Sequence, residues 1–420
     1  MAKIIFLIIV ALIVFDYLSE QLLQYLNDSY RKKDLPEEGK DIYNPQEYAR
    51  QQLYESDKSR FSIITETFSL VLILSVLFLN GFAFLDDFLR RYTENPIYLA
   101  LLFFGIISFI SDIISTPFAV YSTFVIETKY GFNKTTIKTF IFDKLKGWFL
   151  SLLIGIPLFS FIVWIYDKGG DTTWLIAWGG IAVFVIFFTF FYSSLIVPLF
   201  NKQTPLQDGD LRSAIQDFSS KVGFRLKNVF VINGSKRSAK ANAYFSGFGS
   251  KKRIVLYDTL IEQLNIEELV AVLAHEIGHY KKKHVIKNMV ISLLEMGLML
   301  FVLSVFIKNP ILSQALGVLK PSFHVGVVTF GILYGFFSTL LGIVMNLYSR
   351  ANEYEADKFA AVNYNAEALI SGLKKLTVKN LSNLNPHPWY VFVNYSHPPL
   401  LQRIKAMRSL NLSLCKEDKR

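Results

Sequence analysis

The five residues His275-Glu276-Ile277-Gly278-His279 form the most informative stretch of this 420-residue chain. On an α-helix, side chains four positions apart lie on the same face, so both histidines would reach one metal ion together. The glutamate would stand beside that ion, where a carboxylate can take a proton from a metal-bound water. An ordinary amphipathic helix with two surface histidines would show the same five letters. The stretch alone leaves both interpretations open.

The flanking sequence predicts that this stretch is helical. Glu267 and Glu268 fall in the first turns, where carboxylates favour the positive end of the helix dipole. Val270 and Leu273 belong to an apolar stripe with helical spacing. Lysines at 281–283 suit the negative end of the dipole, where a helix would stop.

Composition indicates a chain that lies largely in a membrane. Of its residues 52% are hydrophobic, 38 are phenylalanine and only 19% are charged, which is too apolar for a soluble enzyme. The net charge of +10 fits basic loops facing anionic lipid better than nucleic acid, so we expect membrane lipid as a partner and no nucleic acid. Cys415 is the single cysteine, which excludes an intrachain disulfide and cysteine-rich zinc sites.

Seven segments have the ~20 mostly apolar residues that a membrane-spanning helix needs, or come close to it. They are residues 4–18, 67–85, 97–125, 148–166, 174–199, 289–307 and 325–348. The first has the shortest apolar run, but no small-residue cleavage site follows it, so we interpret it as a retained anchor. Asp112 and Pro117 interrupt the third span and Glu295 interrupts the sixth. These residues indicate a water-filled chamber, polar pairing between helices or an interfacial position.

The lysines and arginines alternate between the loops in a consistent way. They concentrate between the first and second spans, between the third and fourth, after the fifth and after the seventh. Because such residues favour the cytosolic side, we expect the N-terminus outside and residues 200–288 and 349–420 in the cytosol. The chain then divides into residues 1–199 with five spans, 200–288 with the histidine motif, 289–348 with two spans, and 349–420.

Residues 200–262 hold the part of the chain with strand character. We predict strands at 229–232, 242–247 and 253–257, the last two joined by a turn at Gly249-Ser250. A small sheet before a metal-binding helix can hold a peptide by adding it as a further strand at its edge. A sheet with a purely structural role fits these residues equally well.

A catalytic zinc ion has three protein ligands and one open position, so the two histidines need a partner. The pattern H-E-x-x-H-x-x-G-x-x-H is excluded, because Lys282 and Val285 stand where its glycine and third histidine would be. His284 lies one residue too early and off the face of His275 and His279, which predicts a surface residue.

A glutamate from a second helix is the other route to a third ligand. Glu353 and Asp357 follow the last span and lie four residues apart, so one helical face presents both. Glu353 could bind the metal while Asp357 accepts the free N–H of a metal-bound histidine. The same residues also fit a charged surface helix, in which they pair with Arg350 and Lys358. Spacing alone leaves the two possibilities open.

Taken together, these segments resemble the type I CAAX prenyl endopeptidases, a family of seven-span membrane zinc metalloproteases. The resemblance rests on His275-Glu-Ile-Gly-His279 with Glu353-Tyr-Glu-Ala-Asp357, and it extends in order over nearly the whole chain. Further matching stretches are Phe124-Val-Ile-Glu127, Gly131-Phe-Asn133, Asn201-Lys-Gln-Thr-Pro-Leu206, Gly234-Ser-Lys-Arg-Ser238, Asn242-Ala-Tyr-Phe245, residues 252–260 and Ser396-His-Pro-Pro-Leu400.

The resemblance implies an α-helical polytopic fold, with seven transmembrane helices around a chamber and a cytosolic zinc metalloprotease domain that carries a small β-sheet. It also implies one Zn²⁺ per chain and a role for each of nine residues. His275, His279 and Glu353 would bind zinc, Glu276 would be the general base, Asp357 would support a zinc ligand, Asn242 and Ala243 would hold the substrate backbone, and His397 and Arg403 would stabilise the oxyanion or the substrate's terminal carboxylate.

The implied reaction is hydrolysis of a peptide bond near the C-terminus of prenylated CAAX-type or other hydrophobic peptides. The partner is then a peptide or a lipidated protein, and an oligomer is not required. The alternatives are a membrane quality-control protease, or a scaffold with a structural zinc, without prenyl specificity. The connection between Leu260 and Leu269 lacks the long acidic insertion of the family's animal members. That difference favours a bacterial inner membrane over the endoplasmic reticulum of a eukaryote.

Overall fold

The computed structural model describes residues 1–31, 34–170, 172–224, 229–246 and 253–417. Within these ranges seven helices are long and apolar enough to cross a membrane, which confirms the seven predicted spans. They are α1 (Ala2–Ser29), α2 (Pro45–Phe78), α4 (Pro96–Tyr121) with its continuation η2 (Ser122–Glu127), α5 (Ile137–Lys168), α6 (Thr173–Leu195), α11 (His284–Phe306) and α13 (Phe323–Ala360).

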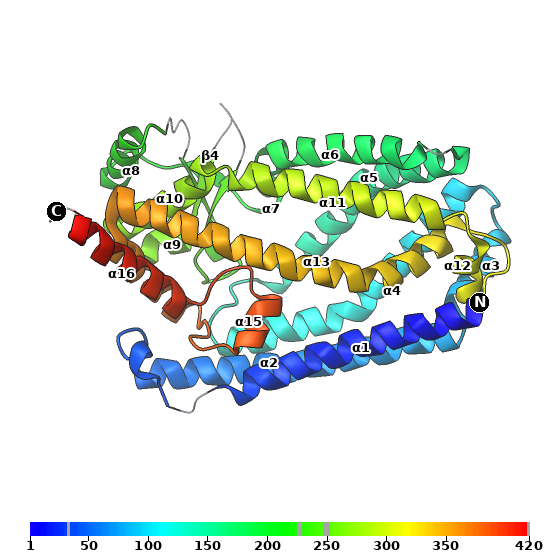
Figure 1. Cartoon of the computed structure of the whole chain (residues 1–420), viewed down its shortest axis with the longest axis horizontal. Helices are drawn as coiled ribbons and strands as arrows, with labels where there is room; N and C mark the ends of the chain where they lie inside the picture. The colour runs from blue at the N-terminus through cyan, green and yellow to red at the C-terminus, as the bar shows by residue number, and fades with distance from the viewer. Residues whose placement is uncertain (32–33, 171, 225–228, 247–252, 418–420) are drawn as a thin grey trace.

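The seven spans lie alongside one another, following the long axis of the molecule (Figure 1). α1 contacts α2, and α2 contacts η2 at the end of α4. Contacts then lead from α4 through α5, α6 and α11 to α13, which in turn contacts α1. The sequence of contacts closes into a ring, and α13 also contacts α4 directly across it.

The second span differs from its predicted limits, because its helix ends at Phe78 instead of continuing to Leu85. Asn80 adopts a left-handed conformation, with a φ of 53°, that a continuous right-handed helix cannot contain. Gly81 follows, and a Cβ atom there would stand 3.1 Å from a carbonyl oxygen of the preceding turn, so the bend favours a glycine. A separate short helix, α3 (Gly81–Arg90), begins at this residue.

The last span is much longer than a membrane is thick. α13 has 38 residues and extends about 57 Å at 1.5 Å per residue, nearly twice the ~30 Å of a bilayer's hydrocarbon core. No proline or glycine stands between Tyr348 and Ala360 to interrupt it. Glu353 and Asp357 therefore lie on the seventh span's own helix and not on a separate one. The predicted divisions after residues 288 and 348 stay predictions, and both fall inside helices.

A small sheet follows the fifth span. Its strands are β1 (Gln203–Pro205), β2 (Val229–Ile232), β3 (Ala243–Ser246) and β4 (Arg253–Tyr257), in the order β1-β2-β4-β3. Three strands lie where they were predicted. β1 was not predicted, because three residues that include a proline do not show the alternating apolar and polar pattern of a strand. Among the described residues β3 pairs only with β4, with Ala243 opposite Leu256, so β3 lies at an edge of the sheet. The predicted turn at Gly249-Ser250 lies outside the described residues.

The histidine motif lies on a helix, α10 (Ile266–Lys281), as predicted. Asn265 and Glu268 form a reciprocal cap at its start, in which each side chain accepts a hydrogen bond from the other's backbone N–H. The apolar side chains of α10 are buried in a core shared with α14 (Ala366–Lys379) and α8 (Asp210–Lys221). The motif therefore lies on a largely buried helix that is not one of the seven candidate membrane spans.

α10 and α13 approach each other closely at one glycine. A Cβ atom on Gly278 would stand 3.1 Å from the Cα atom of Ala356 and 3.2 Å from its carbonyl oxygen. The two backbones can touch because neither residue has a large side chain. This contact places Glu353, one turn before Ala356, beside His275 and His279 of the motif.

Asp112, the acidic residue in the third span, has partners on a neighbouring helix. Its carboxylate accepts hydrogen bonds from Lys144 Nζ at 2.8 Å and from Trp148 Nε1 at 2.9 Å, both on α5. Of the possibilities that the sequence leaves open for this residue, pairing between helices is the one that these contacts support.

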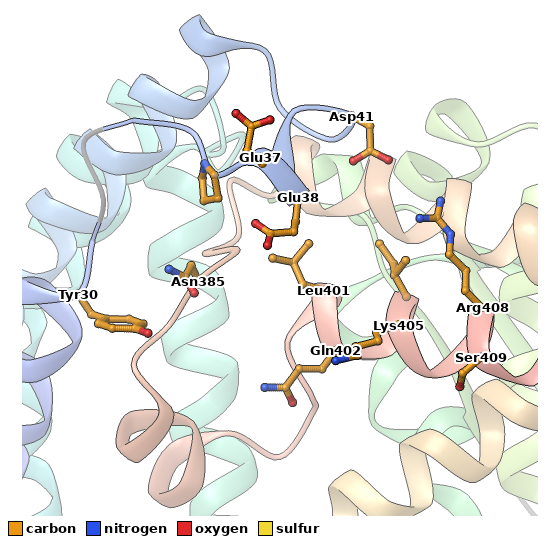
Figure 2. A pocket seen from close by; sticks show the side chains of 12 residues that line it. Tyr30, Glu37, Glu38, Asp41, Asn385, Leu401, Gln402, Lys405, Arg408 and Ser409 are labelled. Carbon is orange, nitrogen blue, oxygen red and sulfur yellow. The ribbon is translucent and has the colours of Figure 1, made fainter.

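Two faces of the last helix, α16 (Leu400–Glu417), have different surroundings. One face borders a cavity of about 860 Å³, in which Glu37 and Glu38 of the loop after α1 lie across from Lys405 and Arg408 (Figure 2). The other face carries Arg403, which contacts α13. The large cavity includes none of the nine candidate residues, so the candidate site lies on the other face of α16.

Candidate metal centre

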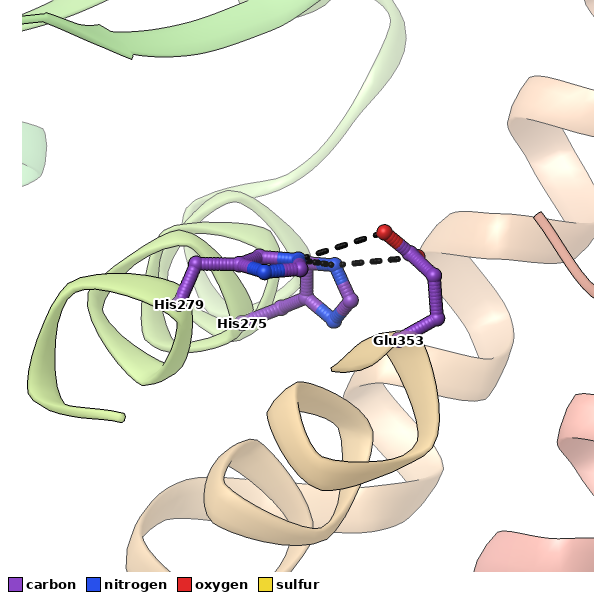
Figure 3. A group of neighbouring side chains, drawn as sticks. All are labelled: His275, His279 and Glu353. Atoms are coloured by element: carbon purple, nitrogen blue, oxygen red, sulfur yellow. Dashed lines mark hydrogen bonds and ion pairs between the residues drawn. The ribbon is translucent and has the colours of Figure 1, made fainter. Parts of the chain in front are cut away.

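Three side chains from two helices meet where α10 and α13 touch. His275 and His279 of α10 point toward Glu353 of α13 (Figure 3). His275 Nε2 lies 3.4 Å from Glu353 Oε2, His279 Nε2 lies 3.3 Å from Glu353 Oε1, and the two Nε2 atoms are 3.1 Å apart. Bonds of about 2.0–2.1 Å in a tetrahedral zinc site place the ligand atoms about 3.3 Å apart. The three donors therefore have the spacing of one zinc site.

The Glu353 carboxylate of this group also has one buried oxygen that no hydrogen bond from the described part of the chain satisfies. Glu353 is 5% exposed, and its Oε2 is a buried acceptor without a hydrogen-bond donor among the described residues. A buried carboxylate is costly unless a cation or several donors offset its charge. Two imidazoles and one carboxylate are also a ligand set of catalytic zinc sites, so the residues fit this metal.

Asp357 contacts the Nδ1 atom of His275, and Arg403 in turn contacts Asp357. Asp357 Oδ1 lies 2.8 Å from His275 Nδ1, and Arg403 donates to both oxygens of Asp357, from Nε at 2.8 Å and from Nη2 at 2.6 Å. Because an ionised carboxylate only accepts, His275 Nδ1 carries the hydrogen of this contact, and Nε2 is the ring nitrogen that could bind a metal once it has lost its own proton. The surface-helix alternative does not hold, since Asp357 is 1% exposed and Arg350 bonds backbone carbonyls instead.

Burial and neighbouring charges shift the pKa values of two groups on α10. Burial lowers the pKa of His275 in the metal-free protein, but hydrogen bonds to Asp357 and Glu353 outweigh it and raise this pKa to about 9. Burial raises the pKa of the Glu276 carboxyl, and the positive neighbours offset only part of the rise. A carboxylate with a raised pKa is a better proton acceptor near neutral pH, which suits a general base.

The three candidate ligands and Glu276 border one cavity of about 560 Å³. Asn242 and Ala243, at the start of the edge strand β3, line the same cavity. Its apolar wall comes from α14 and α10, namely Leu369, Leu373, Leu376 and Val272. The cavity therefore joins the donor group, a sheet edge and an apolar surface, which together can hold an extended peptide with hydrophobic side chains.

His397 and Arg403 both line the cavity, but they differ in exposure. His397 is 65% exposed, with Nε2 at 3.4 Å from Glu353 Oε1 and Nδ1 at 3.0 Å from Ser396 Oγ. Arg403 is buried, and beyond its two bonds to Asp357 its Nη1 lies 3.7 Å from Glu353 Oε2. The exposed histidine can reach a bound substrate directly, whereas the guanidinium is already engaged by two carboxylates.

The prediction of a surface position for His284 is wrong. This residue is 1% exposed, with Nδ1 at 3.0 Å from His279 Nδ1 and Nε2 at 3.2 Å from Glu355 Oε2. α10 ends at Lys281, and Lys283 adopts a left-handed conformation with a φ of 59°. The chain turns there, so His284 begins α11 and lies against α10 instead of continuing it. Residue spacing assumes one straight helix and carries no signal for such a turn.

Comparisons with known proteins agree with this architecture. Residues 24–202 match the family described as CAAX prenyl protease N-terminal, five membrane helices, and residues 205–411 match peptidase family M48. A CAAX prenyl protease 1 homolog of Oryza sativa subsp. japonica is 37% identical over 374 residues, covering 87% of this chain and 88% of that protein. CAAX prenyl protease 1 of Saccharomyces cerevisiae is 34% identical over 418 residues, covering 93% and 91%.

A solved structure shows the same similarity in three dimensions. The crystal structure of S. mikatae Ste24p is similar to this chain with a TM-score of 0.90 and 31% sequence identity, covering 96% of this chain and 99% of that one. The likeness includes both the membrane helices and the part that carries the histidine motif. The chain therefore belongs to the CAAX prenyl protease family, a membrane-spanning branch of peptidase family M48, as its motifs predict.

Proposed function

We propose that this protein is a zinc metalloendopeptidase that hydrolyses a peptide bond near the C-terminus of prenylated CAAX-type or other hydrophobic peptides. The observation that carries the proposal is the meeting of His275, His279 and Glu353 at zinc spacing, on the wall of a cavity that also contains Glu276. The names of the similar rice and yeast proteins support the CAAX class of substrate.

Each side chain of the site has a proposed task. His275, His279 and Glu353 would hold one zinc ion, which supplies a Lewis acid for the scissile carbonyl and lowers the pKa of a water molecule to ~7. Glu276 takes the proton of the attacking water and passes it to the leaving amine. His397, at the exposed rim, donates to the oxyanion or binds the terminal carboxylate of the substrate.

The substrate would bind as an additional strand along β3. Ala243 begins this edge strand and Asn242 precedes it, both at the cavity, where backbone hydrogen bonds can fix a peptide in register with the site. The leucines of α14 would receive aliphatic side chains. A lipid-bearing peptide would pass between the helices of the ring. The basic loops support a cavity that faces the cytosol, in a bacterial inner membrane or in the endoplasmic reticulum.

Detergent-purified protein is expected to contain one zinc ion per chain and to cleave a farnesylated CAAX peptide faster than its unmodified counterpart. Metal analysis and mass spectrometry of the products measure both quantities. The matched control is a CAAX prenyl protease that cuts the same peptides under the same conditions. Zinc-loaded protein that cuts neither contradicts the CAAX assignment. Equal cleavage of unrelated hydrophobic peptides would favour a quality-control protease, and zinc without any hydrolysis would favour a scaffold.

Zinc binding is expected to tighten as the pH rises from about 6 toward 9. The pKa of His275 is raised to about 9 in the metal-free protein, so its proton is bound throughout this window and must leave before Nε2 binds a metal. The apparent association constant should therefore rise about tenfold per pH unit and level off above pH 9. Calorimetric titrations in buffers of different ionisation enthalpy count the proton released per zinc. An affinity that does not change with pH contradicts this expectation.

A further inference from the structure

His279 has a polar partner behind it that is separate from the pair behind His275. His279 Nδ1 faces away from the ligand group and lies 3.0 Å from Nδ1 of His284. The two rings meet edge to face, with centroids 5.1 Å apart and planes at 73°. His284 Nε2 in turn lies 3.2 Å from Glu355 Oε2. A second chain of contacts therefore leads from the metal centre, through an imidazole, to a carboxylate on α13.

The hydrogens of this chain follow from its last member. The ionised Glu355 carboxylate accepts only, so His284 Nε2 carries a hydrogen and donates it. A neutral His284 then has a lone pair on Nδ1, which accepts a hydrogen from Nδ1 of His279. His279 Nε2 is left with its lone pair, and that atom lies beside Glu353 in the group of atoms that could bind a metal. This assignment of hydrogens satisfies the contacts of His284 and of His279 Nδ1, and it leaves His279 in the form that binds a metal.

We propose that His284 is a positioning residue for the metal ligand His279, and that Glu355 holds His284 in the required orientation. The proposal rests on the zinc site of the proposed function. Metal-binding histidines commonly donate their second N–H to such a partner, which fixes the tautomer and the ring plane. His284 and Glu355 do for His279 what Asp357 and Arg403 do for His275.

The left-handed turn is what makes this contact possible. Lys283 has a φ of 59° and a ψ of 28°, a conformation that non-glycine residues seldom adopt. The Lys282 and Lys283 N–H groups bond the carbonyls of Gly278 and Tyr280, so α10 is closed before the turn. α11 then starts with His284 pressed against the last turn of α10. The turn thus brings His284, on the helix of the sixth span, next to the Nδ1 atom of His279 on α10.

The two supporting arrangements differ in strength. Asp357 is a buried carboxylate that contacts its histidine directly, whereas His284 is an imidazole backed by Glu355, which is 52% exposed. A neutral acceptor makes a weaker hydrogen bond than an ionised one. We therefore expect loss of the His284 contact to weaken zinc binding less than loss of the Asp357 contact does.

The experiment compares two substitutions of similar size in the full-length protein in detergent. His284→Leu removes the acceptor, whereas His284→Asn keeps an acceptor oxygen near the position of Nδ1. Competition with a chelator should show that the zinc dissociation constant rises about 10- to 100-fold in the leucine variant and by less than about threefold in the asparagine variant. Glu355→Leu should raise the dissociation constant by less than His284→Leu does, because an exposed anchor is lost and the acceptor remains.

Two further measurements separate positioning from packing. The absorption bands of the Co²⁺-loaded protein should change in His284→Leu and return toward the wild-type form in His284→Asn, because they report ligand geometry. The melting temperature of the metal-free protein reports the packing cost alone. If both variants bind zinc as tightly as the wild type, the positioning role is wrong while the proposed function stands. If the wild type itself binds no zinc, the proposed function fails and the positioning role falls with it.

Discussion

Glu276→Gln is expected to lower the rate of peptide hydrolysis by about 10³- to 10⁴-fold while the protein keeps its zinc. Glutamine has nearly the same shape as glutamate but cannot accept a proton, so the attacking water loses its base. The residue is not one of the three donors, and its side chain lines the cavity beside them. A loss of this size corresponds to about 4–5.5 kcal/mol in the activation barrier. Single-turnover cleavage of a labelled peptide measures it.

A matched control exists on the same helix. Glu267 lies at the start of α10, where it bonds Asn365 away from the cavity. Glu267→Gln therefore makes the same chemical change without touching the site, and it should leave the rate within about twofold. If Glu276→Gln hydrolyses peptides as fast as this control, with its zinc in place, the zinc is structural and the proposed function is wrong.

Much of the fold follows from patterns that sequence alone carries. A run of apolar residues predicts a membrane-spanning helix, because the stability of such a helix in lipid depends on its apolar composition more than on the order of its residues. The cap at Asn265 and the apolar stripe of α10 likewise depend on residues close together in the sequence, so the sequence pattern predicts the helix. The limits of the elements were less predictable. A single left-handed residue, Asn80, ends the second span, although the apolar composition continues beyond it.

The candidate site was predictable only in part for a similar reason. Residue spacing places His275 and His279 on one helical face, but it cannot show that another helix comes close enough to add Glu353. That approach depends on Gly278 touching Ala356, a contact between segments far apart in the chain. The resemblance to a known family supplied Glu353 and Asp357 as expectations. It did not supply His284, which spacing placed on the surface and a turn in the backbone placed at the site.

Asp357→Leu is expected to produce the largest loss of stability in this part of the protein. The change leaves the guanidinium of Arg403 buried without its two-oxygen partner, and it removes the acceptor for His275 Nδ1. Removing one member of a buried ion pair costs about 3–5 kcal/mol, because the remaining charge is uncompensated. Thermal unfolding of the metal-free protein, compared with the wild type in the same detergent, measures the loss.

A double variant separates the buried charge from the orientation of the ligand. Asp357→Leu combined with Arg403→Met replaces the pair by apolar groups of similar size, and such replacements are often neutral or stabilising. The metal-free double variant should therefore recover most of the lost stability. Its zinc affinity should stay about 10- to 100-fold below that of the wild type, because His275 still lacks the acceptor that orients it.

A double variant as unstable as the single one would instead show that the contacts of α16 with α13, and not the unpaired charge, carry the stability. Zinc affinity that returns together with stability would show that His275 needs no acceptor behind it.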